Sequence, residues 1–233
     1  MYCTMPSSCT MILPLHRDVR PCIPHLEDEP MEALASHVAL IQAEAERLVQ
    51  YLSTLPADAW CQPSACQGWE VRDVVAHLVE VAQEHRHILA RGVQGETGPP
   101  GTISDATIAQ SAMAYRERLG ETLLPTFRAQ YAQFCALLAQ LRGGDWDKLC
   151  AYAREPRSRP ARELLALSIQ ELAIHGWDIR SRLESAFHLS PESVTVLVQH
   201  ASKEHRDMHI NSGMEGGLQE AMDHLEQVAV SLR

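Results

Sequence analysis

The chain is poor in aromatic residues, which make up 5% of its 233 residues, and it has no alternating Val, Ile, Thr and Tyr runs bounded by tight-turn dipeptides. Both absences disfavour a sheet, because β-branched and aromatic side chains are the ones that pack well on a pleated surface. Ala, Leu, Val, Glu and Gln recur instead, and most of these residues favour helices. We therefore expect an all-α protein with little strand.

Positive charge is also scarce, since 20 Lys and Arg stand against 30 Asp and Glu and give a formal net charge of −10. Without a basic cluster nothing would neutralise phosphates, which excludes nucleic acid and an anionic membrane surface as partners. The apolar runs are far shorter than the about 18 to 20 residues that a transmembrane helix needs. Residues 11–15 are too short and proline-broken for the core of a signal peptide, so we expect a soluble cytoplasmic protein.

The seven cysteines contain no CxxC pair and are odd in number. This pattern predicts neither a disulfide framework nor a zinc knuckle and indicates reduced thiols. No arrangement of His and Asn marks any cysteine as a nucleophile. For Cys66 we therefore favour simple packing at the start of a helix over a catalytic role.

The spacing of apolar residues divides the chain into helical segments. Residues 1–28 show no period and indicate a disordered leader. Residues 29–188 are expected to form a four-helix bundle, and residues 189–233 a C-terminal extension of further helices, with Ser190 capping the first of them. The four expected bundle helices cover residues 31–55, 68–92, 104–141 and 164–183, and Gly120 and Pro125 are candidate breaks in the third.

The strongest chemical signal joins two of these helices. Glu171 and His175 are four residues apart on the fourth helix, so they share one face, and His77 lies at the edge of the apolar face of the second helix. Two imidazoles and a carboxylate that converge inside a bundle would form a three-ligand site for a divalent metal with one coordination position open. A buried Glu171 also needs a cation or a proton, because an unpaired buried charge is costly.

Nitrogen and carboxylate donors suit Zn²⁺ first, with Ni²⁺, Fe²⁺ or Mn²⁺ as alternatives in a looser site. Asp73 and Asp178 are candidate acceptors for the ring N–H groups of the histidines. Spacing alone does not decide the matter, because helical Glu and His four residues apart also form solvated salt bridges.

Other histidines give similar patterns. The pair His205 and His209, with His200 nearby, has the spacing of a zinc pair, and Glu220 with His224 has that of Glu171 with His175. We interpret His205 and His209 as part of an exposed face, because Lys, Glu, Arg and Asp surround them. His85 and His87 are likewise expected at the surface, near a helix end.

Two segments resemble a known family. Residues 66–78 read CQGWEVRDVVAHL, which is similar to the C-x-G-W-x-V-x-D-V-V-A-H-L motif of the DinB-like superfamily in its mycothiol-dependent maleylpyruvate isomerase branch. Residues 171–179 read ELAIHGWDI and are similar to the E-L-x-x-H-x-W-D-L segment of that branch. The resemblance implies a DinB-like four-helix bundle in which His77, Glu171 and His175 hold a metal, usually zinc. It also implies a low-molecular-weight thiol as co-substrate, mycothiol in actinobacteria.

The function hypothesis is a metal-dependent thiol S-transferase or thiol-assisted isomerase that acts on a small electrophile through a metal-bound thiolate. Maleylpyruvate isomerase proper is one alternative, although that enzyme carries a sizeable C-terminal domain and only about fifty residues follow the fourth helix here. A detoxifying transferase with another thiol such as bacillithiol, and a non-catalytic metal-binding or sensory bundle, are the others. The oligomeric state stays open, with a homodimer among the alternatives.

Overall fold

The computed structural model describes residues 31–96, 105–151, 158–184, 187–190 and 193. Within these ranges the chain is almost entirely helical, as the sequence predicts. The helices are α1 (Met31–Thr54), α2 (Val71–Val93), α3 (Asp105–Leu119), α4 (Leu123–Leu138) and α5 (Glu163–Leu183). Short 3-10 turns cover Ala57–Cys61, Gly120–Thr122 and Gly143–Asp147, and the strands β1 (Leu149–Ala151) and β2 (Ser158–Pro160) pair antiparallel.

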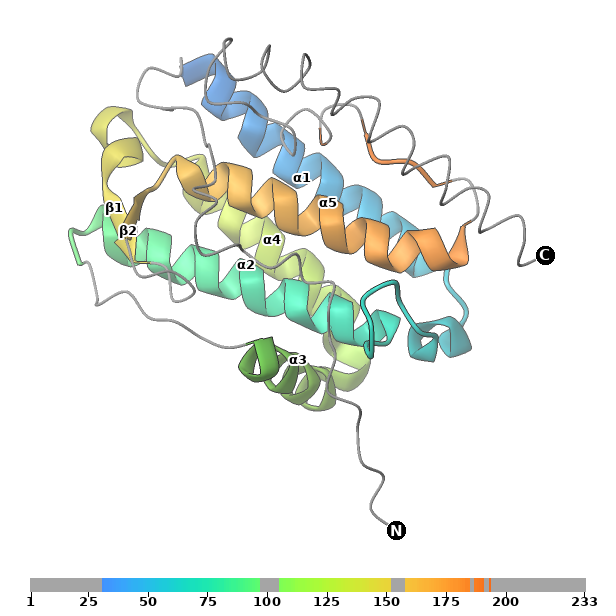
Figure 1. The fold of residues 1–233 in the computed structure, drawn as a ribbon. Helices are drawn as coiled ribbons and strands as arrows, with labels where there is room; N and C mark the ends of the chain where they lie inside the picture. Colours follow the sequence, from blue (N-terminus) through green and yellow to red (C-terminus); the bar gives the residue numbers. More distant parts are fainter. Residues whose placement is uncertain (1–30, 97–104, 152–157, 185–186, 191–192, 194–233) are drawn as a thin grey trace, which may run out of the picture.

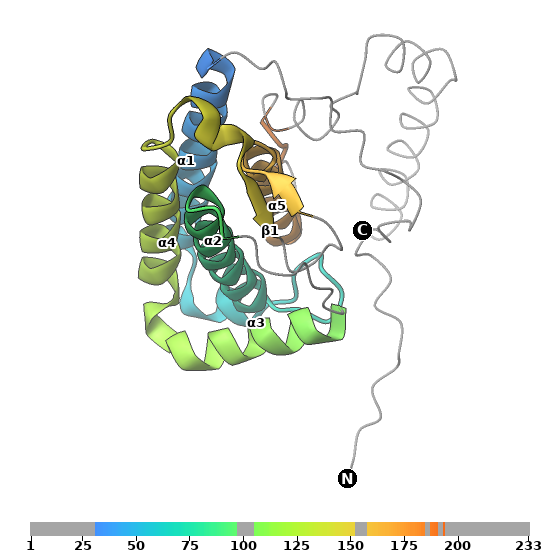
Figure 2. The same ribbon diagram turned by 90° about the vertical axis from the view of Figure 1, so that its left-hand side faces the viewer.

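Four of these helices, α1, α2, α4 and α5, form a bundle (Figure 1). In it α4 packs against α1 and α2, and α5 packs against the same two helices. The pairs α1/α2 and α4/α5 are therefore diagonal. Helix α3 lies outside the bundle and packs on α2, and Figure 2 shows it running across one end of the other helices. The prediction of an all-α four-helix bundle is confirmed.

Helix α2 is the most enclosed element, because α3, α4, α5 and β1 all pack around it. Its apolar positions Val71, Val74, Val75 and Leu78 are each 0% exposed. The helix begins at a capping box, in which the N-cap residue Glu70 and the third helical residue each bond the other's backbone N–H. The second helix is thus fixed both by its cap and by burial on several sides.

The expected helical region 104–141 is not continuous. It divides at Gly120, whose φ of +49° lies in the left-handed region that glycine adopts readily. Pro125 does not break the helix, because it lies in the first turn of α4, where the backbone N–H that proline lacks would have no helical partner. Of the two candidate breaks only Gly120 acts, and the turn there lets α3 leave the bundle.

Gly92, near the end of α2, predicts a stability effect. A Cβ at this position would lie 2.6 Å from the Cys150 sulfur and 2.8 Å from the Leu149 carbonyl oxygen of β1. Gly92→Ala is therefore expected to lower the free energy of unfolding, since overpacking costs about 1–3 kcal/mol and the gain in helix propensity is only about 1 kcal/mol. Urea denaturation measures this change. At exposed Gly144 a Cβ meets nothing within 4 Å, so Gly144→Ala serves as the control, and equal effects of the two substitutions would contradict this account.

Several predictions fall on other parts of the chain. The leader 1–28, most of the extension 189–233, and the histidine patterns at 200, 205, 209 and 224 lie outside the described residues.

Ser190 accepts a hydrogen bond from the backbone N–H of Ser193, at 3.1 Å, as the predicted N-cap requires. The side-chain hydroxyls of Ser190 and Ser193 each donate a hydrogen bond to the Glu44 carboxylate of α1. No helix among the described residues is long and apolar enough to cross a membrane.

Candidate metal site

Helices α2 and α5 bring the three predicted ligands together. His77 of α2 is 2% exposed, and its Nε2 lies 3.4 Å from Oε2 of Glu171 on α5. Nε2 of His175, one turn further along α5, lies 3.4 Å from the same oxygen. One ligand atom from each of the three residues lies within 4.8 Å of the other two. Residues 94 positions apart in sequence thus meet at one point between neighbouring helices.

The spacing of these atoms fits a metal better than it fits direct hydrogen bonds. A charged N–H···O bond is usually about 2.7–2.9 Å long, and both separations here are 3.4 Å. Ligands about 2.0–2.1 Å from a tetrahedral zinc ion are about 3.3–3.4 Å apart. Two imidazole nitrogens and one carboxylate oxygen are also donors that zinc accepts. The residues present therefore fit a divalent ion of this kind.

The three groups influence one another's protonation strongly. Burial alone would raise the pKa of Glu171, but the neighbouring imidazoles of His175 and His77 outweigh burial and bring the pKa well below its usual value. For His175, burial disfavours the charged form, yet Asp178 and Glu171 outweigh it and raise the pKa to about 9. Without a metal, then, a proton on His175 compensates the buried carboxylate.

Asp178 lies where the sequence places an acceptor for a ring N–H. Its Oδ2 is 2.8 Å from Nδ1 of His175, which lies one turn earlier on the same helix. A carboxylate can only accept, so Nδ1 of His175 carries the hydrogen and its Nε2 faces Glu171. This contact fixes both the ring orientation and the nitrogen that is offered to a metal.

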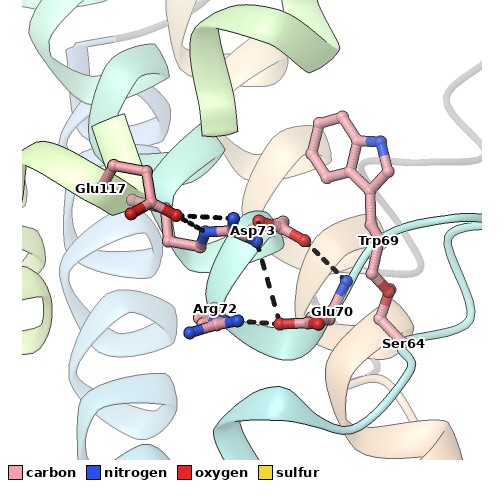
Figure 3. Close-up of polar contacts among 7 residues, drawn as sticks. Ser64, Trp69, Glu70, Arg72, Asp73 and Glu117 are labelled. Atoms are coloured by element: carbon pink, nitrogen blue, oxygen red, sulfur yellow. Dashed lines mark hydrogen bonds and ion pairs between the residues drawn. The ribbon is translucent and has the colours of Figure 1, made fainter. Parts of the chain in front are cut away.

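Asp73 does not have the role that the sequence predicts for it. Its Oδ2 accepts the backbone N–H of Glu70 at 2.9 Å, and its Oδ1 accepts the Arg116 guanidinium of α3 at 2.8 Å. Figure 3 shows Asp73 beside Glu70 and Arg72 at the start of α2. Asp73 is the third residue of α2, where free backbone N–H groups need an acceptor, and this need determines its partner. The expectation that Asp73 supports a ligand histidine is therefore wrong.

The different partners of these two aspartates give a test. Asp178→Asn is expected to weaken metal binding about 10- to 100-fold, because an amide supports the ligand histidine less well than a carboxylate does. Asp73→Asn is expected to leave metal affinity close to wild type and to lower the free energy of unfolding, by about 1 kcal/mol if the cap is lost. Competition with a chromophoric chelator measures the affinities, and thermal denaturation the stabilities. Equal losses of affinity in the two variants would contradict the assignment.

His85 is 0% exposed, so the expectation that it lies at the surface is wrong. Its Nδ1 lies 2.8 Å from the Ser168 hydroxyl of α5, and that hydroxyl donates to the Leu164 carbonyl at 2.7 Å. Nδ1 of His85 must therefore be the donor of the pair. Its position seven residues after Leu78 and four before Leu89, both buried, was the signal that could have found it. His87 is exposed, as expected.

Aromatic rings enclose His77. The Trp69 ring meets the His77 ring edge to face, with centroids 5.5 Å apart, and is itself only 8% exposed. The His77 and His175 rings are nearly perpendicular, with centroids 4.9 Å apart. These contacts hold the His77 ring in place. The class that fold and site define is a helical bundle with a cluster of two histidines and one carboxylate, which fits a divalent metal, between two of its helices.

Comparison with known proteins gives the family. Residues 41–180 match the family model of the mycothiol maleylpyruvate isomerase N-terminal domain. The chain belongs to this family, which lies within the DinB-like superfamily. The resemblance that residues 66–78 and 171–179 carry is therefore confirmed. No curated protein matches the chain in sequence.

Two solved structures share the fold. The crystal structure of the mycothiol-dependent maleylpyruvate isomerase is 19% identical with a TM-score of 0.57, over 66% of this chain and 62% of that one. YfiT from Bacillus subtilis, described as a probable metal-dependent hydrolase with an unusual four-helix bundle topology, is 17% identical. Its TM-score is 0.52, over 67% of this chain and 91% of YfiT. The chain thus spans less than two thirds of the isomerase.

Proposed function

We propose that this protein is a metal-dependent enzyme that uses a low-molecular-weight thiol of the mycothiol type against a small electrophilic substrate. The reaction is S-transfer or thiol-assisted isomerisation, and the metal is most simply zinc, held by His77, Glu171 and His175. The observation that carries this proposal is the 3.4 Å spacing of both histidine nitrogens from one Glu171 oxygen. The only group of metal-ligand residues among the described parts of the chain has these three members.

His77, Glu171 and His175 would leave one position on a four-coordinate ion for an exogenous group, as in catalytic zinc sites. A metal at this position would lower the pKa of a bound thiol and supply a thiolate at neutral pH. The side chains then have separate tasks. Glu171 supplies negative charge, Asp178 keeps the hydrogen of His175 on Nδ1, and Trp69 packs against His77 and excludes water from it.

An external thiol agrees with the state of the protein's own buried cysteines. Burial raises the pKa of both Cys135 and Cys150 to about 11, so these groups are thiols rather than thiolates at neutral pH. Neither is suited to attack an electrophile. Small thiols are kept reduced in the cytoplasm, and the proposal therefore also assigns the protein to that compartment.

Two outcomes follow from a common adduct. If the thiolate adds to an activated C=C bond, a C–S bond forms and the π electrons move to the neighbouring carbonyl. Rotation about the former double bond and expulsion of the thiolate give isomerisation, whereas protonation of the carbanion and release of the thioether give S-transfer. The family name favours the first outcome for maleylpyruvate. For other small electrophiles the second outcome, S-transfer, is favoured.

The test is consumption of an electrophile by the zinc-loaded protein with mycothiol, bacillithiol or no thiol. Monobromobimane reports S-transfer by substitution, in which the thiolate forms the C–S bond as bromide leaves, and maleylpyruvate tests for isomerase activity proper. We expect a thiol-dependent rate that a chelator removes and added zinc restores. A rate that is indifferent to the chelator would refute the mechanism. Stoichiometric zinc without activity toward either electrophile would instead favour the non-catalytic, metal-binding alternative.

A further inference from the structure

A third helix contributes an unusual tyrosine to the layer of the bundle that contains the metal site. Tyr131 of α4 is 2% exposed, and its ring packs against Phe127 with centroids 4.8 Å apart. Its hydroxyl oxygen is buried, and no described residue gives it a hydrogen-bond partner. Phenylalanine would fill the same space without an unsatisfied polar group, so the hydroxyl needs an explanation.

Helix α1 shows that Tyr131 and the metal site lie at the same height in the bundle. Ala45 and Val49 of α1 border a cavity of about 320 Å³ together with Tyr131. Leu48, on the next face of α1, borders a second cavity together with Leu172 of α5, the residue that follows Glu171. The same two turns of α1, residues 45–49, therefore face Tyr131 on one side and the segment with the metal ligands on the other.

The electrostatics of the phenol point the same way. Burial raises the pKa of Tyr131 well above its usual value, and the next cause is the charge of Glu171, ahead of Cys135. The hydroxyl therefore stays protonated and is a neutral donor at any physiological pH. Glu171 lies on α5, diagonally opposite α4, so the influence acts across the core of the bundle.

We propose that Tyr131 is a positioning residue for the metal site, and that its hydroxyl donates a hydrogen bond, directly or through one water, to the Glu171 carboxylate when that group binds a metal. This inference rests on the proposed metal site at His77, Glu171 and His175. Carboxylates that bind metals are themselves held by hydrogen bonds, which orient them for the ion. Tyr131 gives Glu171 a support from a helix that carries no ligand.

The test is Tyr131→Phe, which removes only the oxygen. Zinc affinity, measured by competition with a chromophoric chelator, is expected to fall about 10- to 100-fold. The absorption spectrum of the Co²⁺-substituted protein is expected to change, because the carboxylate changes its orientation. The melting temperature of the metal-free protein should stay unchanged or rise, because the substitution removes an unsatisfied buried group.

Tyr115→Phe is the matched control. Tyr115 lies on α3, outside the bundle, and its hydroxyl donates to Gln83 at 2.8 Å, so its loss should leave zinc affinity and the Co²⁺ spectrum unchanged. Wild-type affinity and spectrum in Tyr131→Phe would overturn the proposal. The proposal would also be overturned if Tyr131→Phe lowered the free energy of unfolding of the metal-free protein by as much as it lowered the free energy of zinc binding, since the hydroxyl would then be structural. Absence of stoichiometric metal in the wild-type protein would overturn the metal site itself, so the metal content of the wild type distinguishes that failure from one at Tyr131 alone.

Discussion

His77→Ala and Glu171→Ala are each expected to abolish stoichiometric zinc in the purified protein. Structural zinc sites with four ligands bind with about 10–16 kcal/mol, so one ligand accounts for about 2.5–4 kcal/mol, or roughly 60- to 700-fold in affinity. His77 and Glu171 come from different helices, and no described group replaces either at the site. Metal content by mass spectrometry, together with chelator competition, measures the loss.

His87→Ala is the control for these variants, because His87 lies on the same helix as His77 but is exposed. It should keep one zinc per chain. The far-ultraviolet circular dichroism of all three variants should match the wild type, since α2 and α5 are held by apolar packing. Full zinc occupancy in either ligand variant would show that the ion, if any, binds elsewhere.

Zinc is also expected to raise the melting temperature strongly. At free zinc a thousandfold above the dissociation constant, binding stabilises the native state by about 4.1 kcal/mol, which for a chain of this size corresponds to about 8–16 °C. The effect should vanish in Glu171→Ala and persist in His87→Ala. Differential scanning calorimetry with chelator and with a zinc buffer measures the shift. A shift that is equal in all variants would indicate binding outside the site.

The pH dependence of this shift has a defined sign. In the metal-free protein the pKa of His175 is raised to about 9. The stability that this group contributes is fully present below its unfolded pKa of about 6.5 and is lost as the pH rises through about 9. Zinc must displace that proton. The zinc-induced shift should therefore grow between pH 6.5 and 9, and a shift that shrinks over this range would contradict the assignment.

Local signals in the sequence were sufficient for the helices. The three- and four-residue spacing of apolar residues predicts α1, α2 and α5 to within a few residues, because each helix buries one continuous stripe. The bounds of the helices within residues 104–141 were harder to predict, because Gly120 and Pro125 could both break a helix. Only the backbone shows that the glycine turns the chain while the proline fits into the first turn of α4.

The partners of the polar residues could not be predicted from sequence spacing. Asp73 and Asp178 each lie a turn from a candidate ligand, yet one caps α2 and the other bonds a ring nitrogen. Their sequence spacing is similar, and the difference depends on the helix end and on Arg116 from α3. His85 was predicted at the surface because histidine is polar. It is buried because the Ser168 hydroxyl of α5 lies within hydrogen-bond distance of its ring.

The sequence by itself determined the helical class, the family and the fact that Glu171 and His175 share one face of a helix, because all three follow from residue order and the helical repeat. Tertiary structure decided whether His77 meets that face, since the packing of α2 against α5 joins residues that no periodicity connects. It also decided which carboxylate orients a histidine and brought Tyr131 level with the site. Those relations depend on distances across the bundle core, which local sequence does not encode.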